Sequence, residues 1–289
     1  MKVAGNDAFE FLQGQFSNEL RRPPGSVTYG LWLNPKGKVV ADSHVLRMAA
    51  NEFHIASVKS TAANIRQRLE EYIVADEVVL TDETDRAHGL TIWGQGSNAG
   101  IKSLLGEVPA PGCFLQRGGL MIHRGRRFPG ETFEVFGPKD ALAEAEAELL
   151  SHGAVRADET ELEFARICAG IPAVPADLGP GDLPNEGGLD DTALSYTKGC
   201  YLGQEVMARL KNLGQVRRRL HVVRGRGPTP APRAALYQGE KKTGEIRSVA
   251  ACADEFVALA MLSLVNLQRE AGLSLEPSGP ANISLAPHG

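Results

Sequence analysis

The segment TKGCYLGQEV, residues 197–206, contains the residue types best suited to chemistry in this chain. Lys198 and Cys200 lie two positions apart, just before a helix predicted over residues 201–210. A thiol at a helix N-terminus beside an ammonium group favours the thiolate, which attacks electrophiles and binds soft metals. The free backbone N–H groups of the same helix start could hold a carboxylate or a phosphate.

Two further polar residues, Gln204 and Glu205, follow inside this helix, where their side chains could face a cleft. The alternative is that Cys200 packs as a small buried hydrophobic residue, as free cysteines often do, while Lys198 is a solvated charge. The local pattern leaves both interpretations open.

A cluster of arginines, Arg217, Arg218 and Arg219 with Arg224 and Arg226, follows the same helix. It could contact a polyanion, for example a polyglutamate tail or the phosphates of tRNA. Because successive residues of a strand point to opposite faces, these arginines would not share one surface. A charged barrel surface is therefore the favoured interpretation.

The turn at residues 34–38, Asn-Pro-Lys-Gly-Lys, joins two predicted strands and places Lys36 at its tip. A lysine at this position could bind an anion if the turn lies beside a cleft. The seven histidines have no spacing typical of metal ligands, so we predict no metal site.

The chain of 289 residues is long enough for two or three domains, and its 43% hydrophobic and 23% charged residues are typical of a globular protein. A net charge of −4 gives no general attraction to nucleic acid or anionic membranes. No apolar run reaches the ~18 residues of a membrane span, and the N-terminus lacks signal-peptide features. Four widely spaced cysteines indicate reduced thiols rather than a disulfide framework, so we expect a cytoplasmic protein. We also expect a monomer.

Three units are predicted to position these residues. The first, residues 1–85, has an initial helix, a hairpin turned at residues 34–38, a further strand, a second helix and a short strand. The second, residues 86–214, repeats the order of strands followed by a helix, which suggests an internal duplication, and contains the segment quoted above. Within it, residues 170–199 form a long irregular segment rich in Pro, Gly and Asp. Residues 215–289 are predicted to form a small β-barrel.

Four stretches of the chain resemble a single family. They read GNDAFEFLQGQFSNEL (5–20), LNPKGKVVADSHVLR (33–47), RICAGIPAVPADL (166–178) and LPNEGGLDDTALSYTKGCYLGQEVMARL (183–210). Together they resemble the YgfZ-type folate-binding proteins, which are relatives of the glycine-cleavage T-protein, an aminomethyltransferase. The resemblance covers nearly the whole chain, and the string Lys-Gly-Cys-Tyr-Leu-Gly-Gln-Glu is its most specific part.

This resemblance implies an α+β fold in which two antiparallel-sheet-plus-helix units and a small C-terminal β-barrel form a ring of domains around bound tetrahydrofolate. It implies that Cys200 is the functional, catalytic thiol and faces the central cavity. No equivalent of the T-protein's catalytic carboxylate is evident. The residues that the resemblance implies for binding the folate are Lys198, Gly199, Tyr201, Gly203, Gln204, Glu205, Lys36 and Arg166.

We therefore expect a folate-binding accessory protein for iron–sulfur cluster assembly or repair. Its expected partners are iron–sulfur enzymes such as a radical-SAM enzyme that methylthiolates tRNA, without direct contact to nucleic acid or membrane. The first alternative is a T-protein-like enzyme that transfers a one-carbon group to or from tetrahydrofolate, which would need a carboxylate beside the folate nitrogen. The second is a non-catalytic scaffold for iron–sulfur clients. Whether Cys200 attacks a one-carbon unit or a persulfide, or passes on sulfur or an iron ligand, stays open.

Overall fold

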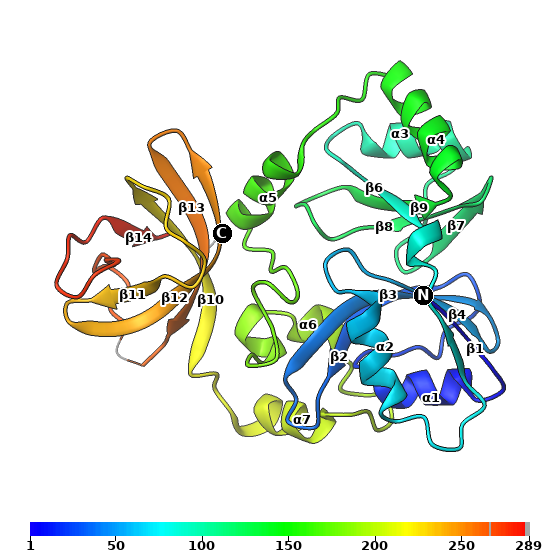
Figure 1. The fold of residues 1–289 in the computed structure, drawn as a ribbon, viewed down its shortest axis with the longest axis horizontal. Helices are drawn as coiled ribbons and strands as arrows, with labels where there is room; N and C mark the ends of the chain where they lie inside the picture. The colour runs from blue at the N-terminus through cyan, green and yellow to red at the C-terminus, as the bar shows by residue number, and fades with distance from the viewer. Residues whose placement is uncertain (266, 287–289) are drawn as a thin grey trace.

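The computed structural model describes residues 1–265 and 267–286 of the chain, and three β-sheets dominate them. Figure 1 shows the sheets at the three corners of the molecule, with the helix α5 (Glu159–Cys168) between the second and the third. The N-terminus lies between the first two sheets. The α+β arrangement expected from the sequence is confirmed.

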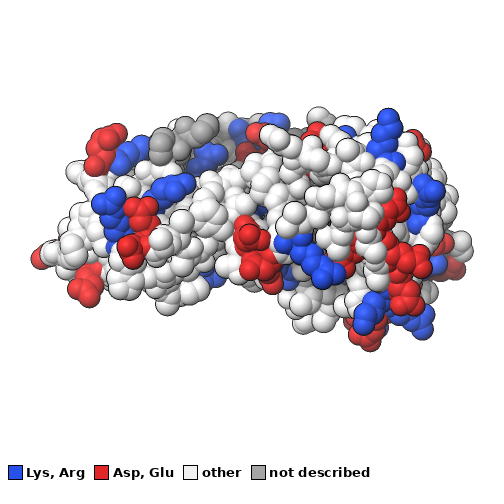
Figure 2. All heavy atoms as spheres, turned by 90° about the horizontal axis from the view of Figure 1, so that it is seen from above, with Lys and Arg blue, Asp and Glu red and all other residues white. Residues whose placement is uncertain are grey.

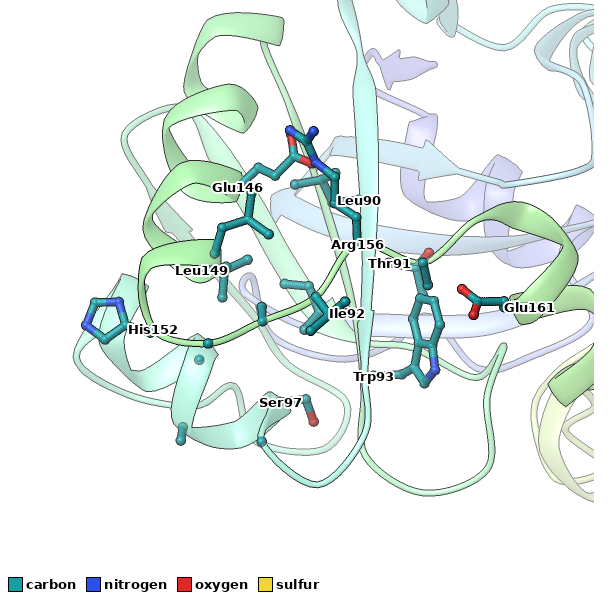
Figure 3. Close-up of a pocket in the computed structure, with 18 residues that line it drawn as sticks. Leu90, Thr91, Ile92, Trp93, Ser97, Glu146, Leu149, His152, Arg156 and Glu161 are labelled. Atoms are coloured by element: carbon teal, nitrogen blue, oxygen red, sulfur yellow. The ribbon is translucent and has the colours of Figure 1, made fainter.

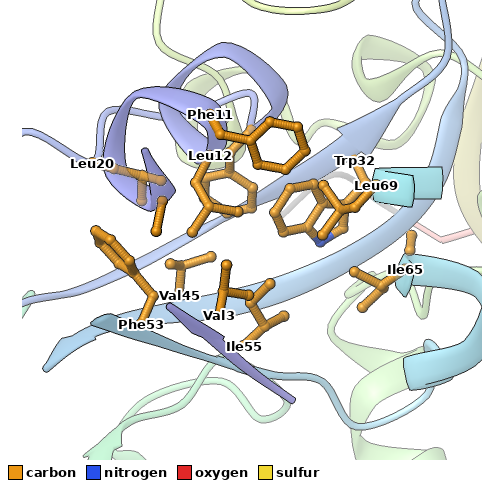
Figure 4. Packing of buried hydrophobic residues seen from close by; sticks show 13 residues of the cluster. Val3, Phe11, Leu12, Leu20, Trp32, Val45, Phe53, Ile55, Ile65 and Leu69 are labelled. Atoms are coloured by element: carbon orange, nitrogen blue, oxygen red, sulfur yellow. The ribbon is translucent and has the colours of Figure 1, made fainter. Parts of the chain in front are cut away.

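The first sheet has the strand order β2-β3-β4-β1-β5 and is covered on one face by α1 (Ala8–Gln15) and α2 (Ala62–Glu70). Apolar side chains from both helices and from the sheet form the core between them, with Phe16 and Trp32 fully buried (Figure 4). The strands of this sheet are β1 (Lys2–Ala4), β2 (Val27–Leu33), β3 (Val39–Ala49), β4 (Glu52–Ala56) and β5 (Val79–Thr81).

The second sheet, in the order β6-β9-β8-β7, is packed on one face by α3 (Ser97–Leu105) and α4 (Lys139–Ser151). Its strands are β6 (His88–Trp93), β7 (Phe114–Arg117), β8 (Leu120–Arg124) and β9 (Thr132–Gly137).

The two sheets repeat one topology, which confirms the predicted duplication. In the first, the strands run β1-β4-β3-β2, with one helix after β1 and another after β4. In the second, the order β6-β9-β8-β7 is the same, with α3 after β6 and α4 after β9. The helix α3 is missing from the sequence prediction, because Ser97, Asn98 and Gly100 weaken its helical pattern.

In the structure the long irregular segment continues through the following helix to residue 213, and it packs on the first sheet, whereas the sequence groups it with the second unit. Its apolar residues, including Leu178 and Met207, bury the face of β2 and β3 that lies opposite α1 and α2, where Leu31 and Leu33 project. This segment contains three short elements before the barrel, η2 (Pro184–Gly187), α6 (Asp190–Ala193) and α7 (Gln204–Leu213).

The third sheet is curled, in the order β11-β12-β13-β10-β14, as expected for a small barrel. Residues 273 and 274 form bridges to β14 and β11, so that they connect the two outer strands. The β12 strand carries a bulge between Ile246 and Ser248 that helps it to bend. The strands are β10 (Arg218–Arg226), β11 (Ala235–Gln238), β12 (Lys241–Cys252), β13 (Glu255–Ser263) and β14 (Ile283–Leu285).

Buried ion pairs join the barrel to the irregular segment. The guanidinium of Arg247, 6% exposed, makes two hydrogen bonds of 3.0 Å to the carboxylate of Asp182. Arg218 donates to the same carboxylate at 2.9 Å and to Glu186 at 2.7 Å. Because a buried charge is costly without its partner, these contacts fix the barrel against the rest of the chain.

Acidic and basic side chains alternate over the face seen in Figure 2, where neither sign dominates. The arginine cluster is divided, since Arg226 is exposed and pairs with Glu255, as expected for a charged barrel surface, whereas Arg218 turns to the buried acids Asp182 and Glu186. Within residues 1–265 and 267–286, no helix has the length and apolar character needed to cross a membrane.

Candidate functional site

Lys198 of the signature string is buried, 6% exposed, and holds the end of helix α1. Its ammonium donates to the backbone carbonyls of Gln13 and Phe16, both at 2.7 Å, and of Asn18 at 2.9 Å. All three N–H donors of the ammonium are therefore used by carbonyls in the last turn of α1 and just beyond its end. Burial lowers the pKa of Lys198 to about 8. In this geometry the lysine fixes the chain and has no donor left for an anion.

The helix α7 starts at Gln204, three residues later than predicted, and Gly203 is its N-cap. Gly203 has a φ of +84°, and a Cβ at this position would lie 3.0 Å from the carbonyl oxygen of Asn34 and from the Cα of Gly37. Only glycine allows this backbone conformation and this close approach. The glycine thus presses the start of α7 against the hairpin turn at residues 34–38.

Tyr201 and Gln204 complete the inner side of the loop. The amide N–H of Tyr201 donates to Oε1 of Gln204 at 3.3 Å, and the backbone N–H of Gln204 donates back to the carbonyl of Tyr201 at 3.1 Å. The ring of Tyr201 is buried in the core between the loop and the first sheet, which raises the pKa of its phenol to about 12. Both residues therefore shape the loop.

Cys200 is exposed, as are its neighbour Gly199 and Glu205 in the first turn of α7. Since α7 begins at Gln204, the thiol lies outside the first turn, where the helix dipole acts most strongly. Cys200 also lies outside the three main cavities that the described residues enclose. Lys198 ties the loop to the end of α1, and the expectation that Cys200 faces a central cavity stays a prediction.

Of the two remaining predicted residues, Lys36 is exposed at the tip of the hairpin beside α7. Arg166 is 2% exposed and bonds Asp177 at 2.7 Å, Glu163 at 2.7 Å and the carbonyl of Ile171 at 2.6 Å. Arg166 alone of the predicted residues lines a polar cavity between the first sheet and the segment 171–174. The structure thus gathers the signature string in one loop and places Arg166 elsewhere.

This small polar cavity, of about 50 Å³, lies where β3, β4 and the segment 171–174 meet the loop after β8. Asp42 of β3 is its central acid and accepts hydrogen bonds from Ser60 Oγ at 2.8 Å and from the Tyr29 hydroxyl at 3.0 Å. Burial raises the pKa of Asp42, and the hydrogen bond from Ser60 and the charge of Arg126 oppose this shift. Arg126 also donates to the Tyr29 hydroxyl at 2.8 Å and lies 4.1 Å from its ring centre.

A second cavity, of about 730 Å³, lies between the first and second sheets and shares Lys59, Arg127 and Glu134 with the small one. Burial raises the pKa of Glu134 to about 7. Its Oε2 accepts from Thr91 at 2.7 Å, whereas its buried Oε1 has no hydrogen-bond partner among the described residues.

Two histidines, His44 and His123, connect the sheets at the wall of this larger cavity. Their ring centres are 4.4 Å apart, and burial lowers the pKa of both, that of His123 to about 4. Both rings are therefore neutral near pH 7. No group of metal-ligating side chains is found within residues 1–265 and 267–286.

Sequence reasoning missed Asp42 and Glu134, although a signal for both was present. Each acid stands in an apolar strand, Asp42 in VVADSHV and Glu134 in FEVF. A carboxylate in such a strand is seldom buried unless it has a partner or a function.

The comparisons agree with this architecture. Residues 1–110 match the family described as the GCVT N-terminal domain, and residues 217–287 match the C-terminal β-barrel domain of CAF17. The solved aminomethyltransferase T of the glycine cleavage system from Bartonella henselae superposes with a TM-score of 0.80 and 18% identity, over 98% of this chain and 81% of that protein.

Two curated relatives carry the name of an iron–sulfur cluster assembly factor, IBA57, of mitochondria. The Mus musculus protein is 28% identical over 252 residues, and the Mycosarcoma maydis homologue is 26% identical over 235 residues. The matches cover 80% and 76% of this chain but only 65% and 53% of those relatives, so the chain spans between half and two thirds of their length.

These findings confirm the resemblance seen in the sequence. The chain is similar to the GCVT N-terminal domain at its start and to the C-terminal β-barrel domain of CAF17 at its end, and it shares the fold of the solved aminomethyltransferase T.

Proposed function

We propose that this protein is an iron–sulfur cluster assembly factor that binds a reduced folate between its first two sheets and presents Cys200 to partner proteins. The names of the relatives support the first part. The observation that carries the proposal is the separation of the two chemical sites, since the exposed thiol and the buried acids lie in different places.

The residues of the larger cavity fit a folate. Its volume of about 730 Å³ lies within the range of about 300–1,000 Å³ that is usual for ligand pockets. A pterin ring offers an amino group and a ring N–H along one edge, and the unpartnered Oε1 of Glu134 is an acceptor for such an edge. Arg127 supplies positive charge for the carboxylates of the glutamyl tail, whereas Lys59 is already paired with Glu159 and Glu163. Histidines in the wall stay neutral and offer flat surfaces.

Cys200 suits a macromolecular partner. An exposed thiol in a rigid loop is accessible to another protein, and thiolate sulfur is a preferred ligand of iron–sulfur clusters and an acceptor of sulfur. The cluster or sulfur would be cargo that passes between this protein and its clients. The proposed clients are iron–sulfur enzymes, among them the tRNA-methylthiolating radical-SAM enzyme that the family resemblance implies.

One observation favours a second candidate, a T-protein-like one-carbon transferase. Asp42 is a carboxylate with a raised pKa in the polar cavity, and its neighbours Tyr29 and Ser60 hold it in place. A carboxylate of this kind can hold or accept a proton at a bound folate nitrogen. Formation of methylenetetrahydrofolate from an aminomethylated lipoyl carrier, lost in Asp42→Asn, would favour this candidate over the first.

Calorimetry with tetrahydrofolate under reducing conditions tests the folate site. We expect binding to the wild type, binding weaker by about tenfold in Glu134→Gln, and unchanged binding in Cys200→Ser. Absence of binding at millimolar tetrahydrofolate contradicts the folate part of the proposal.

Recovery of iron–sulfur enzyme activity in cells that lack the endogenous factor tests the thiol. Cys200→Ser should fail to restore it, whereas Cys113→Ser, which alters another exposed thiol, should succeed. Full recovery with Cys200→Ser contradicts the role of the thiol and favours the scaffold.

A further inference from the structure

A groove of about 780 Å³ runs along the outer edge of the second sheet and shares Thr91 with the larger cavity (Figure 3). It is lined by β6, by the ends of α3 and α4 and by the linker at residues 153–157. The groove has no place in the proposed function.

The floor of the groove is the open edge of a strand. β6 is the outer strand of its sheet and pairs only with β9. The backbone N–H of Gly94 donates to the carbonyl oxygen of Glu131, in the same register as the pairing of β6 with β9. Because hydrogen-bonded pairs alternate along an antiparallel ladder, the backbone groups of residues 90 and 92 also bond to β9. The backbone groups of Thr91 and Trp93 therefore point into the groove, and no described residue bonds to them.

The opposite wall has free backbone groups as well. Residues 155–157 of the linker make no backbone hydrogen bond to any described part of the chain. Val155, in the same stretch, is 88% exposed. Two facing backbones with free donors and acceptors, together with an exposed apolar side chain, suit an extended polypeptide better than a small molecule.

Charged side chains in the groove favour a peptide with a basic residue. Arg156 forms an ion pair with Glu146, with 2.8 Å between Nε of the arginine and Oε1 of the glutamate. The side chain of Glu161 accepts from the backbone N–H of Asp158 and has no basic partner among the described residues. Figure 3 shows the carboxylate of Glu161 directed towards the indole of Trp93. An aromatic face beside an unneutralised carboxylate is a site for a Lys or Arg side chain.

We propose that β6 docks an extended segment of a partner protein, which adds as a further strand and places a basic side chain between Trp93 and Glu161. Apolar residues of the segment, on either side of the basic one, cover Ile92 and Val155. The occupant is thus a basic, β-prone peptide. Docking at this edge uses the backbone of Thr91, whose hydroxyl bonds Glu134 in the larger cavity, and it does not involve Cys200.

The probe is the capped peptide acetyl-Thr-Val-Lys-Val-Thr-Val-amide, added to the whole protein. Trp93 is a natural reporter, because the second tryptophan, Trp32, is fully buried in the first sheet. We expect a saturable change in tryptophan fluorescence and slower hydrogen exchange at the amides of Thr91 and Trp93. Unchanged exchange at both amides overturns the proposal.

Three matched changes test the mode of binding. A probe with N-methyl groups on alternate residues should not bind, because it lacks the edge donors. Replacing its lysine by norleucine, or changing the protein by Glu161→Gln, should each weaken binding about threefold. Gln keeps the capping interaction of residue 161, so the helix α5 stays intact. Equal affinity for all probes and both proteins contradicts the proposal.

A second copy of this chain is the rival occupant of the edge. Sedimentation of the protein alone separates the two cases. If the protein alone is a monomer at the concentrations used for the probe titration, the edge is a peptide site. If it is instead a dimer that the probe dissociates, and if the Thr91 amide is protected from exchange without probe, the proposal is overturned.

Discussion

The ammonium of Lys198 lies 2.7 Å from the carbonyl oxygen of Phe16, and this bond joins residues 182 positions apart in the chain. Lys198 thereby ties the signature loop to the end of α1. The bond explains how an exposed cysteine is held in a defined place on the surface.

Replacing this lysine should destabilise the protein. Lys198→Met leaves three backbone carbonyls without their donor, so we expect the free energy of unfolding to fall by about 3 kcal/mol. Urea denaturation followed by circular dichroism measures the change. Lys36→Met is the control, because Lys36 is exposed and should shift the free energy by less than about 0.5 kcal/mol. Equal urea midpoints for Lys198→Met and Lys36→Met would show that Lys198 does not stabilise the fold.

Two glycines of the signature should respond differently to alanine. Gly203→Ala places a Cβ 3.0 Å from the Asn34 carbonyl oxygen at a φ of +84°, so we expect a loss of about 2 kcal/mol. A Cβ on Gly199 would meet no atom within 4 Å, and Gly199→Ala should be tolerated. Thermal unfolding of both variants makes the comparison. A tolerated Gly203→Ala contradicts the close approach of α7 to the hairpin.

The buried acid Glu134 should make stability depend on pH. Its pKa is raised from 4.5 to about 7 by burial, so the folded state binds more protons than the unfolded state between these values. The contribution of Glu134 is full below pH 4.5 and is lost as the pH rises through 7. Glu134→Gln keeps a neutral group, so its advantage over the wild type should grow to about 3 kcal/mol above pH 7. A constant difference between pH 4.5 and 8 would show that the acid ionises freely.

The barrel should loosen when its buried ion pair is cut. Arg247→Met removes both 3.0 Å bonds to Asp182, and we expect a loss of about 3 kcal/mol. Arg233→Met, in which an exposed pair with Glu245 is lost, should cost less than about 1 kcal/mol. Limited proteolysis should cut the first variant faster between α7 and β10. Similar losses in both variants would argue against a special role for the buried pair.

Thiol labelling should divide the cysteines by exposure. Cys113, Cys200 and Cys252 are exposed and should react quickly with Ellman's reagent in the native protein. Cys168 is partly buried at the end of α5, so it should react more slowly. Four equally fast thiols would contradict the packing of α5 on the barrel.

Much of the fold could be predicted because its signals are local. The hairpin at residues 34–38, the strands of the second sheet and the barrel strands β10 to β13 follow from alternating apolar residues and turn residues, whereas β14 was not predicted. β1 could not be found in this way, because Lys2–Ala4 is too short to show a pattern and is defined by its partners β4 and β5.

The site was predicted only in part, because its contacts are distant in sequence. Nothing near Lys198 indicates that its partners lie in α1, so an anion site and a structural role could not be told apart. The irregular segment is also far in sequence from the first sheet, so its packing there could not be predicted. Asp42 and Glu134 were visible as acids in apolar strands, but their common location depends on how the two sheets face each other.

The irregular segment has a consequence for synthesis on the ribosome. Ser17 and Ala193, which are hydrogen-bonded in the finished protein, are separated by 176 positions. At about 5–20 residues per second, the outer face of the first sheet waits roughly ten to thirty-five seconds for the segment that covers it. During that interval Leu31 and Leu33 are open to water and to other nascent chains. The N-terminal domain can therefore begin to fold early, but it becomes safe from aggregation only when most of the chain has emerged.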